Sequence, residues 1–335
     1  MSVTRVALGK ASGLGALVAG SVFCTLLILA PSVQAQDYPS RAVKIIVPFP
    51  AGGTADAMPR VVAEWLSRKW GQPIVIENRA GAGGNVGAEV AFKSDPDGFT
   101  LLSAPPPPLV INHNLYPKLG FNPLEFVPII IMGRVPNALL VNPDRVKANS
   151  VAEFIASAKA NPDKSFTSAT QGNGTTSHLT SEMFAMMAKI KLQHIPYRGA
   201  APALTDLIGG TVDIMFDNLG VSLQQVQAGK LKLLGVATSK RLASLPNVPT
   251  IAETLPGFEA WAWFAIVAPP KTPAPIVAKI NADANEALRD PEVRKRFDLF
   301  SAEIVGGTPQ ATASYMRDEV ERWNNIIKSA GVKLE

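Results

Sequence analysis

Two short stretches of the chain have the residue types and spacing to hold an anion. The first is PAGGTAD (Pro50–Asp56), and the second is TQGNGTTSH (Thr170–His178). In both, a strand-like run ends in glycines, and a helix-like pattern begins beside hydroxyl side chains. A helix N-terminus has unpaired N–H groups and partial positive charge, so it can hold a carboxylate or a phosphate without a metal ion. One such turn can serve geometry alone, but two in one chain predict an anion held between two lobes.

Hydroxyl side chains stand beside both groups of amides and would add hydrogen-bond donors there. They belong to Thr54, Thr175, Thr176 and Ser177. We expect the carboxylate of Asp56 to cap the first helix rather than to contact a ligand directly. A cap at Asp56 leaves Pro59 in the first turn of that helix, where a missing N–H group is tolerated.

Charged residues end or follow two strand-like runs in the second half of the chain. Arg198 comes after KLQHIP (Lys191–Pro196), and Asp217 lies near the end of VDIMFDN (Val212–Asn218). Arg198 could bind a ligand carboxylate through a charge-assisted hydrogen bond worth roughly 1.5–3 kcal/mol. It could equally pair with Asp206 or Asp217 as part of the scaffold. Both interpretations stay open at this point.

Patterns for other chemistries are incomplete or missing from the sequence. The glycines of NRAGAGGNVGAE (Asn78–Glu89) have the spacing G-x-G-x-x-x-G, one residue too long for a dinucleotide fingerprint, and no Walker or G-x-S-x-G sequence occurs. The histidines His113, His178 and His194 do not show metal-ligand spacing with one another or with a carboxylate pair. The sequence therefore predicts no catalytic residue, no metal site and no cofactor.

Short apolar runs alternate with helix-like patterns along the chain. A strand, a helix, a strand, a short helix and a strand are expected, in this order, at residues 44–49, 57–70, 73–78, 86–93 and 99–104. A second alternating set begins at residue 138, and a return crossing is expected at residues 261–270. This order predicts an α/β fold with parallel sheets, in which ligands gather at the carboxyl ends of the strands.

The first 35 residues have the order of parts that a secretory signal peptide shows. Arg5 and Lys10 precede the uncharged run Ala11–Ala30, and VQA (Val33–Ala35) offers small residues at a cleavage site. A retained membrane anchor is the alternative, because the uncharged run is long enough to span a bilayer. Cleavage would remove Cys24, which is the only cysteine, and it predicts a periplasmic protein without disulfides.

The charge pattern argues against nucleic acid as a partner. The formal net charge is +5, and the basic residues are scattered except for RKRF (Arg294–Phe297). Such a run is most often the solvated face of a helix. No basic stripe with interleaved aromatic residues occurs, so no nucleic-acid binding is predicted.

Several longer segments together resemble one known family. They are DYPSRAVKIIVPFPAGGTAD, PIVIENRAGAGGNVGAE, DPDGFTLL, TSATQGNGTTSHL, IPYRGAAPALTDLIGG and WFAIVAPPKTP, and they follow one another over almost the whole predicted mature chain. In these segments the chain resembles the Bug family, the extracytoplasmic solute-binding receptors of tripartite tricarboxylate transporters. The resemblance implies an α/β fold of the two-lobed periplasmic binding protein type (type II-like). Each lobe would be a mostly parallel sheet flanked by helices, with the ligand cleft between the lobes.

The resemblance also implies where the lobes begin and end and what they bind. Residues 36–136 and 263–335 are expected in lobe 1, and residues 137–262 in lobe 2. The ligand would be a small carboxylate, and the partners would be the membrane permease subunits of the transporter, with the receptor itself a monomer. The ligand-binding residues so implied are Phe49, Gly52, Gly53, Thr54, Ala55, Asp56, Ala104, Ala169, Gln171, Gly174, Thr175, Thr176, Ser177, Tyr197, Arg198 and Asp217.

One segment departs from the family pattern. The loop after the third strand usually begins with glycine or small polar residues, but here Ala104 is followed by Pro105–Pro108. Prolines donate no N–H group, so a more apolar pocket and a longer or aromatic acid are expected. The alternatives are a sensor subunit with the same fold and ligand, and an enzyme using the same cleft, although no cofactor fingerprint or activated nucleophile supports an enzyme.

Overall fold

Strands and helices alternate along the chain, as the sequence predicts. The computed structural model describes residues 1–2, 4, 7, 38–161, 163 and 165–332, so the predicted signal peptide at residues 1–35 falls almost entirely outside the described residues. Residues 1–40 and 41–335 are separate units, and every helix and strand described belongs to the second. Among the described residues, no helix combines the length and the apolar character that crossing a bilayer requires.

Ten strands form the sheets in the described part of the chain. They are β1 (Val43–Val47), β2 (Ile74–Asn78), β3 (Thr100–Ala104), β4 (Val127–Val141), β5 (Phe166–Thr170), β6 (Leu192–Pro196), β7 (Ile214–Asn218), β8 (Lys232–Val236), β9 (Trp261–Ala268) and β10 (Glu303–Gly306). The α-helices are α2 (Thr54–Trp70), α3 (Asn85–Phe92), α4 (Val151–Ala160), α5 (Thr176–Ala188), α6 (Ala200–Ile208), α7 (Leu219–Gln227), α8 (Ala274–Arg289), α9 (Pro291–Asp298) and α10 (Pro309–Ala330).

The strands join in the order β2–β1–β3–β9–β4–β7–β5–β6, while β8 and β10 pair with β4 off this path. Strand β1 is parallel to β2 and β3, and β5 is parallel to β6 and β7. Strand β4, however, runs antiparallel to β9 and β7, and β9 runs antiparallel to β3. The α/β fold is confirmed, but the sheets are mixed rather than mostly parallel, because β4, which passes between the two halves, and β9 both run antiparallel to their neighbours.

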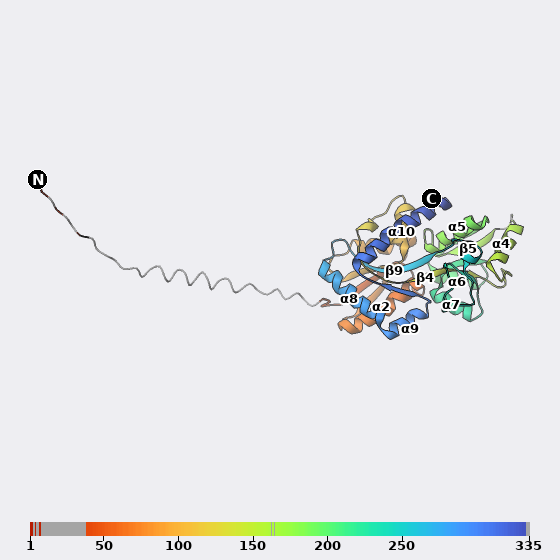
Figure 1. The fold of residues 1–335 in the computed structure, drawn as a ribbon, viewed down its shortest axis with the longest axis horizontal. Helices are drawn as coiled ribbons and strands as arrows, with labels where there is room; N and C mark the ends of the chain where they lie inside the picture. The colour runs from red at the N-terminus through yellow and green to blue at the C-terminus, as the bar shows by residue number, and fades with distance from the viewer. Residues whose placement is uncertain (3, 5–6, 8–37, 162, 164, 333–335) are drawn as a thin grey trace. The chain divides into compact units, whose positions relative to one another are not determined.

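Strand β4 belongs to both halves of this arrangement. Its residues Val127–Pro136 pair with β9, and its residues Asn137–Val141 pair with β7. We call β1, β2, β3, β9, β10 and the first part of β4 lobe 1, and we call β5 to β8 with the second part of β4 lobe 2. Figure 1 shows α2, α8 and α9 gathered around one end of β4 and β9, and α4, α6 and α7 around the other.

Each lobe has its own apolar core. In lobe 1, the buried indole of Trp263 on β9 donates a hydrogen bond to Glu319 of α10 at 2.8 Å, and Trp323 donates to the same carboxylate at 2.9 Å. This buried carboxylate is therefore satisfied within the core. In lobe 2, the rings of Phe184 and Phe216 lie 5.2 Å apart. The cores fix the strands, and the strands in turn place the loops that follow their carboxyl ends.

Helix α3 lies so close to the chain leaving β1 that residue 87 has no room for a side chain. A Cβ atom at Gly87 would lie 2.7 Å from the carbonyl oxygen of Arg79 and 2.8 Å from the Cα atom of Pro48. Because both neighbours are backbone atoms, we expect Gly87→Ala to lower the free energy of unfolding by at least about 1 kcal/mol. Thermal unfolding measures this, with Gly209→Ala as the control, since a Cβ atom there first meets an atom at 3.4 Å. An equal loss of stability in both variants would contradict the prediction.

Candidate functional site

Loops that follow the carboxyl ends of four parallel strands surround a cavity of about 260 Å³ between the lobes. Strands β1 and β2 of lobe 1 and strands β5 and β6 of lobe 2 supply these loops, and Tyr116 adds a ring from lobe 1. The lining residues are Phe49, Pro50, Ala80, Gly81, Ala82, Gly83, Gly84, Tyr116, Gln171, Gly172, Asn173, Pro196, Tyr197 and Arg198. Ligands of parallel α/β sheets bind at this edge.

The carboxylate of Asp56 stabilises the turn after β1 through hydrogen bonds on the side of the turn that faces away from the cavity. Helix α2 begins at Thr54, so the prediction that Asp56 is its N-cap is wrong. The carboxylate instead accepts hydrogen bonds from the Gly52 N–H at 3.2 Å, the Asn78 amide at 2.9 Å and the Arg60 guanidinium at 2.8 Å. Burial opposes the negative charge, but these donors outweigh it and lower the pKa of Asp56. Asp56 therefore shapes the turn from behind and does not line the cavity.

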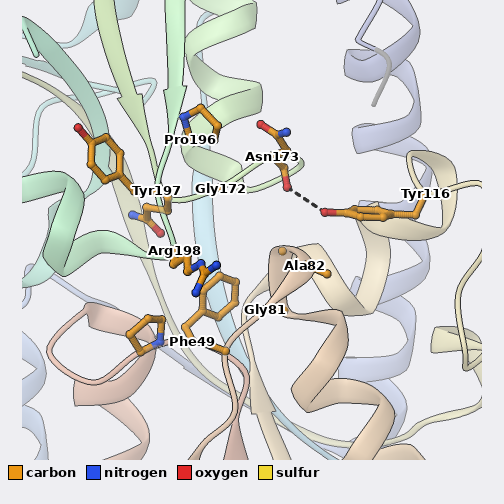
Figure 2. Close-up of a pocket in the computed structure, with 14 residues that line it drawn as sticks. Phe49, Gly81, Ala82, Tyr116, Gly172, Asn173, Pro196, Tyr197 and Arg198 are labelled. Atoms are coloured by element: carbon orange, nitrogen blue, oxygen red, sulfur yellow. Dashed lines mark hydrogen bonds between the residues drawn. The ribbon is translucent and has the colours of Figure 1, made fainter. Parts of the chain in front are cut away.

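The two lobes touch each other beside the cavity. The hydroxyl of Thr54 in lobe 1 donates to the carbonyl of Asn218 at 3.4 Å and accepts from the N–H of Val221 at 3.4 Å. On another side, the hydroxyl of Tyr116 donates to the carbonyl of Asn173 at 3.5 Å, the dashed line in Figure 2. All three hydrogen bonds are long and therefore weak. Beside the cavity, the direct hydrogen bonds between the lobes are therefore weak ones.

Two glycines allow this close approach of the lobes. Gly83 has a φ of 61°, and a Cβ atom there would lie 3.0 Å from the carbonyl oxygen of Asn173. Gly199 has a φ of 123°, and a Cβ atom there would lie 2.7 Å from Cδ of Pro50. A side chain at either position would be strained and would hold the facing loops apart. The closed arrangement of the cavity therefore depends on these glycines.

The hydroxyl groups of the second glycine turn are used within lobe 2. Thr175 is the N-cap of helix α5, and the hydroxyl of Thr176 accepts from the side-chain amide of Asn218 at 3.2 Å. The hydroxyl of Ser177 donates to the carbonyl of Phe216. All three side chains are buried, and none lines the cavity. They organise the turn, whereas the residues just before them, Gln171 to Asn173, face the cavity.

Arg198 carries the only full charge among the residues that line the cavity. The sequence left open whether it pairs with Asp206 or Asp217. Asp206 instead accepts from the hydroxyl of Tyr197 at 2.6 Å, and burial together with this carboxylate raises the pKa of Tyr197 to about 12. Asp217 accepts from the amide of Gln171 at 2.6 Å. Arg198 has no ion pair or hydrogen bond with any described residue, and Figure 2 shows its side chain on the side of the cavity where Phe49 lies.

A family model for the tripartite tricarboxylate transporter family receptor (TctC) matches residues 58–332. The chain belongs to the TctC receptor family. Protein BugT of Bordetella pertussis is 39% identical to it over 321 residues, which is 95% of this chain and 98% of BugT. The predicted family is therefore confirmed.

Solved structures similar to this TctC-family receptor have the same fold over nearly their whole length. R. palustris Rpa4515 with adipate is 36% identical, with a TM-score of 0.86 over 89% of this chain and 99% of that one. The periplasmic binding protein BugD is 34% identical, with a TM-score of 0.84 over 89% and 100%. MatC from Rhodopseudomonas palustris with bound malate is 32% identical, with a TM-score of 0.81 over 87% and 100%. The two-lobed periplasmic binding protein fold is confirmed by these likenesses.

The structure brings only part of the predicted site of this TctC-family receptor to the cavity. Of the predicted residues, those that line it are Phe49, Gln171, Tyr197 and Arg198. Those in the turn and helix start beside it are Gly52, Gly53, Thr54, Ala55 and Asp56, and the corresponding ones in lobe 2 are Gly174, Thr175, Thr176 and Ser177. Those enclosed in strands are Ala104, Ala169 and Asp217, all of them buried.

The largest group of residues that the sequence interpretation missed is the loop Ala80–Gly84. This glycine-rich segment follows β2, and its glycine spacing does not fit a dinucleotide site. The sequence signal for this loop is its position directly after β2. Because β2 is parallel to β1, the loops that follow these two strands leave the sheet at the same edge. The prolines Pro105–Pro108 are buried and do not line the cavity, so they do not make its walls more apolar.

One cluster of side chains in this receptor could hold a metal ion. The ligand atoms of His178, Glu182 and His194 all lie within 4.8 Å of one another, with Oε1 of Glu182 3.5 Å from Nε2 of His178 and 3.1 Å from Nε2 of His194. The expectation that no histidine has metal-ligand spacing is thus corrected: His178 and Glu182 are one helical turn apart, and β6 adds His194. Hydrogen bonds from both rings lower the pKa of Glu182 to about 2.

The proton positions in this cluster favour hydrogen bonding over metal binding. The N–H of Gly174 donates to Nδ1 of His178 at 3.3 Å. A neutral imidazole that accepts at Nδ1 carries its proton on Nε2 and cannot also ligate a metal through Nε2. The Nε2–H group of His178 therefore donates to Glu182, and the ring connects that carboxylate to the loop before α5.

We expect two substitutions of His178 to separate these contacts. In His178→Asn the side-chain oxygen occupies the region of Nδ1 and can still accept from Gly174, whereas in His178→Gln the amide reaches only toward Glu182. The Gly174 N–H should therefore exchange with solvent about fivefold faster in the Gln variant, for a lost hydrogen bond worth about 1 kcal/mol. Amide hydrogen exchange followed by NMR measures this rate. Equal exchange in the two variants would show that the contact with Nδ1 does not hold the loop.

Proposed function

We propose that this TctC-family receptor binds a small carboxylate in the cavity between its lobes and delivers it to the membrane permease of a tripartite transporter. The observation that carries this proposal is the guanidinium of Arg198, which has no hydrogen-bond or ion-pair partner in the part of the chain that the structure describes. It is the one full charge on a cavity wall that contains no carboxylate. A guanidinium binds carboxylates through two parallel N–H···O bonds, which suits a planar, singly charged group.

The walls around Arg198 support an acid with an apolar body. The rings of Phe49 and Tyr116 and the ring of Pro50 come from lobe 1, and Pro196 and Tyr197 come from lobe 2. Two similar solved structures, Rpa4515 and MatC, hold adipate and malate, and both ligands are dicarboxylates. We therefore propose a dicarboxylic acid of about four to six carbons as the ligand. Phe49, Gln171, Tyr197 and Arg198 are the contact residues in this proposal.

Closure of the lobes would make binding and release possible. A ligand stabilises the closed form only through contacts made with both lobes. In this proposal the lobes turn where β4 passes from one sheet to the other, which supports a lobe boundary at residues 136/137. The chain returns to lobe 1 at the start of β9, close to the second expected boundary at 262/263. The weak direct bonds of Thr54 and Tyr116 to lobe 2 suit a closed form that ligand contacts must complete.

A non-catalytic role in the periplasm follows from the same proposal. The lining contains no nucleophile beside a general base and no pair of carboxylates. The family is one of solute-binding receptors, and the N-terminal sequence has the parts of a secretory signal. We propose that the mature protein works in the periplasm as a monomer and that its macromolecular partners are the permease subunits.

A thermal-shift screen over carboxylic acids tests the proposed function. At a concentration of about 100 times its Kd, a ligand that binds only the native state should raise the melting temperature by roughly 5–10 °C. We expect this shift with dicarboxylates of four to six carbons, and no shift with the uncharged diamides of the same length. The diamides are the matched control because they keep shape and remove charge. Equal shifts with acids and diamides, or no shift with any acid, would refute the proposal.

A further inference from the structure

The side-chain amide of Gln171 has a fixed orientation at the cavity wall. Its Nε2 group donates to Oδ1 of Asp217 at 2.6 Å and to Oδ1 of Asn218 at 3.2 Å. An ionised carboxylate only accepts hydrogen bonds, so the NH₂ end of the amide must be the end that faces Asp217. The carbonyl end, Oε1, is thereby turned away from these two partners.

A buried chain of amides holds this orientation from behind. The Nδ2 group of Asn218 donates to Oδ1 of Asn137 at 2.8 Å, and the Nδ2 group of Asn137 donates to the hydroxyl of Thr180 at 2.9 Å. These three side chains are at most 5% exposed. Because the donors of Asn218 are directed inward, its Oδ1 atom is left to accept from Gln171. Reversing the amide of Gln171 would place two oxygen atoms against each other at Asp217.

The oxygen of Gln171 is therefore the polar atom that this side chain offers to the cavity. Gln171 is half-buried and lines the cavity, whereas Asp217 and Asn218 do not. Among the described residues none donates to its Oε1 atom, and this atom is not one of the fully buried polar atoms without a partner. It is accessible, and it can only accept a hydrogen bond.

We propose that Gln171 selects ligands that carry a hydrogen-bond donor, namely hydroxy- or amino-substituted dicarboxylic acids, over unsubstituted ones. This inference rests on the proposed function. Arg198 supplies donors for a carboxylate, while the oxygen of Gln171 would repel a second carboxylate oxygen and attract a hydroxyl or ammonium group. A bound ligand would cover this acceptor, and an analogue that lacks the matching donor would then leave it unsatisfied and bind less tightly.

Isothermal titration with matched pairs of acids tests this inference. The pairs are succinate with malate, glutarate with glutamate, and adipate with 2-aminoadipate, each differing by a single donor group. For at least one pair we expect the wild-type protein to bind the substituted acid about tenfold more tightly, as one hydrogen bond to a charged or polar partner provides. Gln171→Met, which keeps the length of the side chain and removes the acceptor, should reduce this ratio to within about twofold.

The matched control for Gln171→Met is the same substitution at Gln193. Gln193→Met makes the same chemical change at an exposed position on β6, outside the cavity, and should keep the wild-type ratio. If the wild-type protein binds unsubstituted acids as tightly as substituted ones, or if Gln171→Met keeps the preference, the inference is wrong while the proposed function stands. If no acid of the three pairs binds to the wild-type protein, the proposed function and the inference both fail.

Discussion

Replacing Arg198 with methionine is expected to weaken the binding of a dicarboxylate by roughly tenfold to a hundredfold. The range follows from a charge-assisted hydrogen bond of about 1.5–3 kcal/mol, at about 1.4 kcal/mol for each factor of ten. Because Arg198 is an exposed residue, solvent screening of the contact would place the loss in the lower part of this range. Methionine keeps the apolar stem of the side chain, so the loss reports the guanidinium. Isothermal titration at low and high salt measures it.

Arg198→Lys is the matched control for this prediction. Lysine keeps the positive charge but has no planar fork of donors, so it should recover part of the affinity and remain several-fold weaker than arginine. The folded state should be unaffected in both variants, because no described residue pairs with the guanidinium and its removal leaves no buried partner unsatisfied. Wild-type affinity in Arg198→Met would show that the carboxylate lies elsewhere, and the proposed site would then be wrong.

The fold could be predicted from the sequence where hydrophobic pattern and turn residues agree. The runs at residues 44–49, 73–78 and 99–104 correspond to β1, β2 and β3 in parallel register. The first part of β4 could not be predicted in the same way, because Pro128, Gly133 and Pro136 interrupt the apolar run and usually mark turns. The structure accommodates them at two register shifts in the pairing with β9 and near the change of sheet. Tertiary pairing overrides the local signal there.

Four of the residues predicted for the site, namely Phe49, Gln171, Tyr197 and Arg198, line the cavity, and the others lie beside it or within strands. Strand order shows which edge of the sheet binds ligands, so loops such as those of Phe49 and Arg198 could be named from the sequence. The direction of a polar side chain depends on distant partners that the sequence does not display. Asp56 is bound by the guanidinium of Arg60 and the amide of Asn78, and this is why it does not cap α2. The same applies to Ser177, whose partner Phe216 is 39 residues away.

Replacing Asp217 with asparagine is expected to remove a pH-dependent destabilisation of the native state. Asp217 is 1% exposed, and its Oδ2 atom has no hydrogen-bond partner among the described residues. Burial raises its pKa from 3.8 to about 6. The folded protein therefore holds this proton more tightly than the unfolded chain does. The resulting stabilisation is complete below pH 3.8 and is lost as the pH rises through about 6, a total change of about 3 kcal/mol.

The test is the difference in unfolding free energy between Asp217→Asn and the wild type, measured with urea at pH 4.5 and 7.5. Between these two pH values the wild type should lose about 2 kcal/mol of unfolding free energy from this group, whereas the variant has no proton to lose there. The unfolding free energy of the variant should therefore rise by about 2 kcal/mol relative to that of the wild type. Asp144→Asn, the same change at an exposed carboxyl group, controls for general charge effects. A difference that stays constant with pH would mean that Asp217 does not change its protonation state between the two values, and the prediction would then be wrong. A difference that increases from pH 4.5 to 7.5 would show that Asp217 carries a buried negative charge at neutral pH and that this charge lowers the stability of the native state. The same carboxylate accepts the hydrogen bond from the amide of Gln171 at the cavity wall.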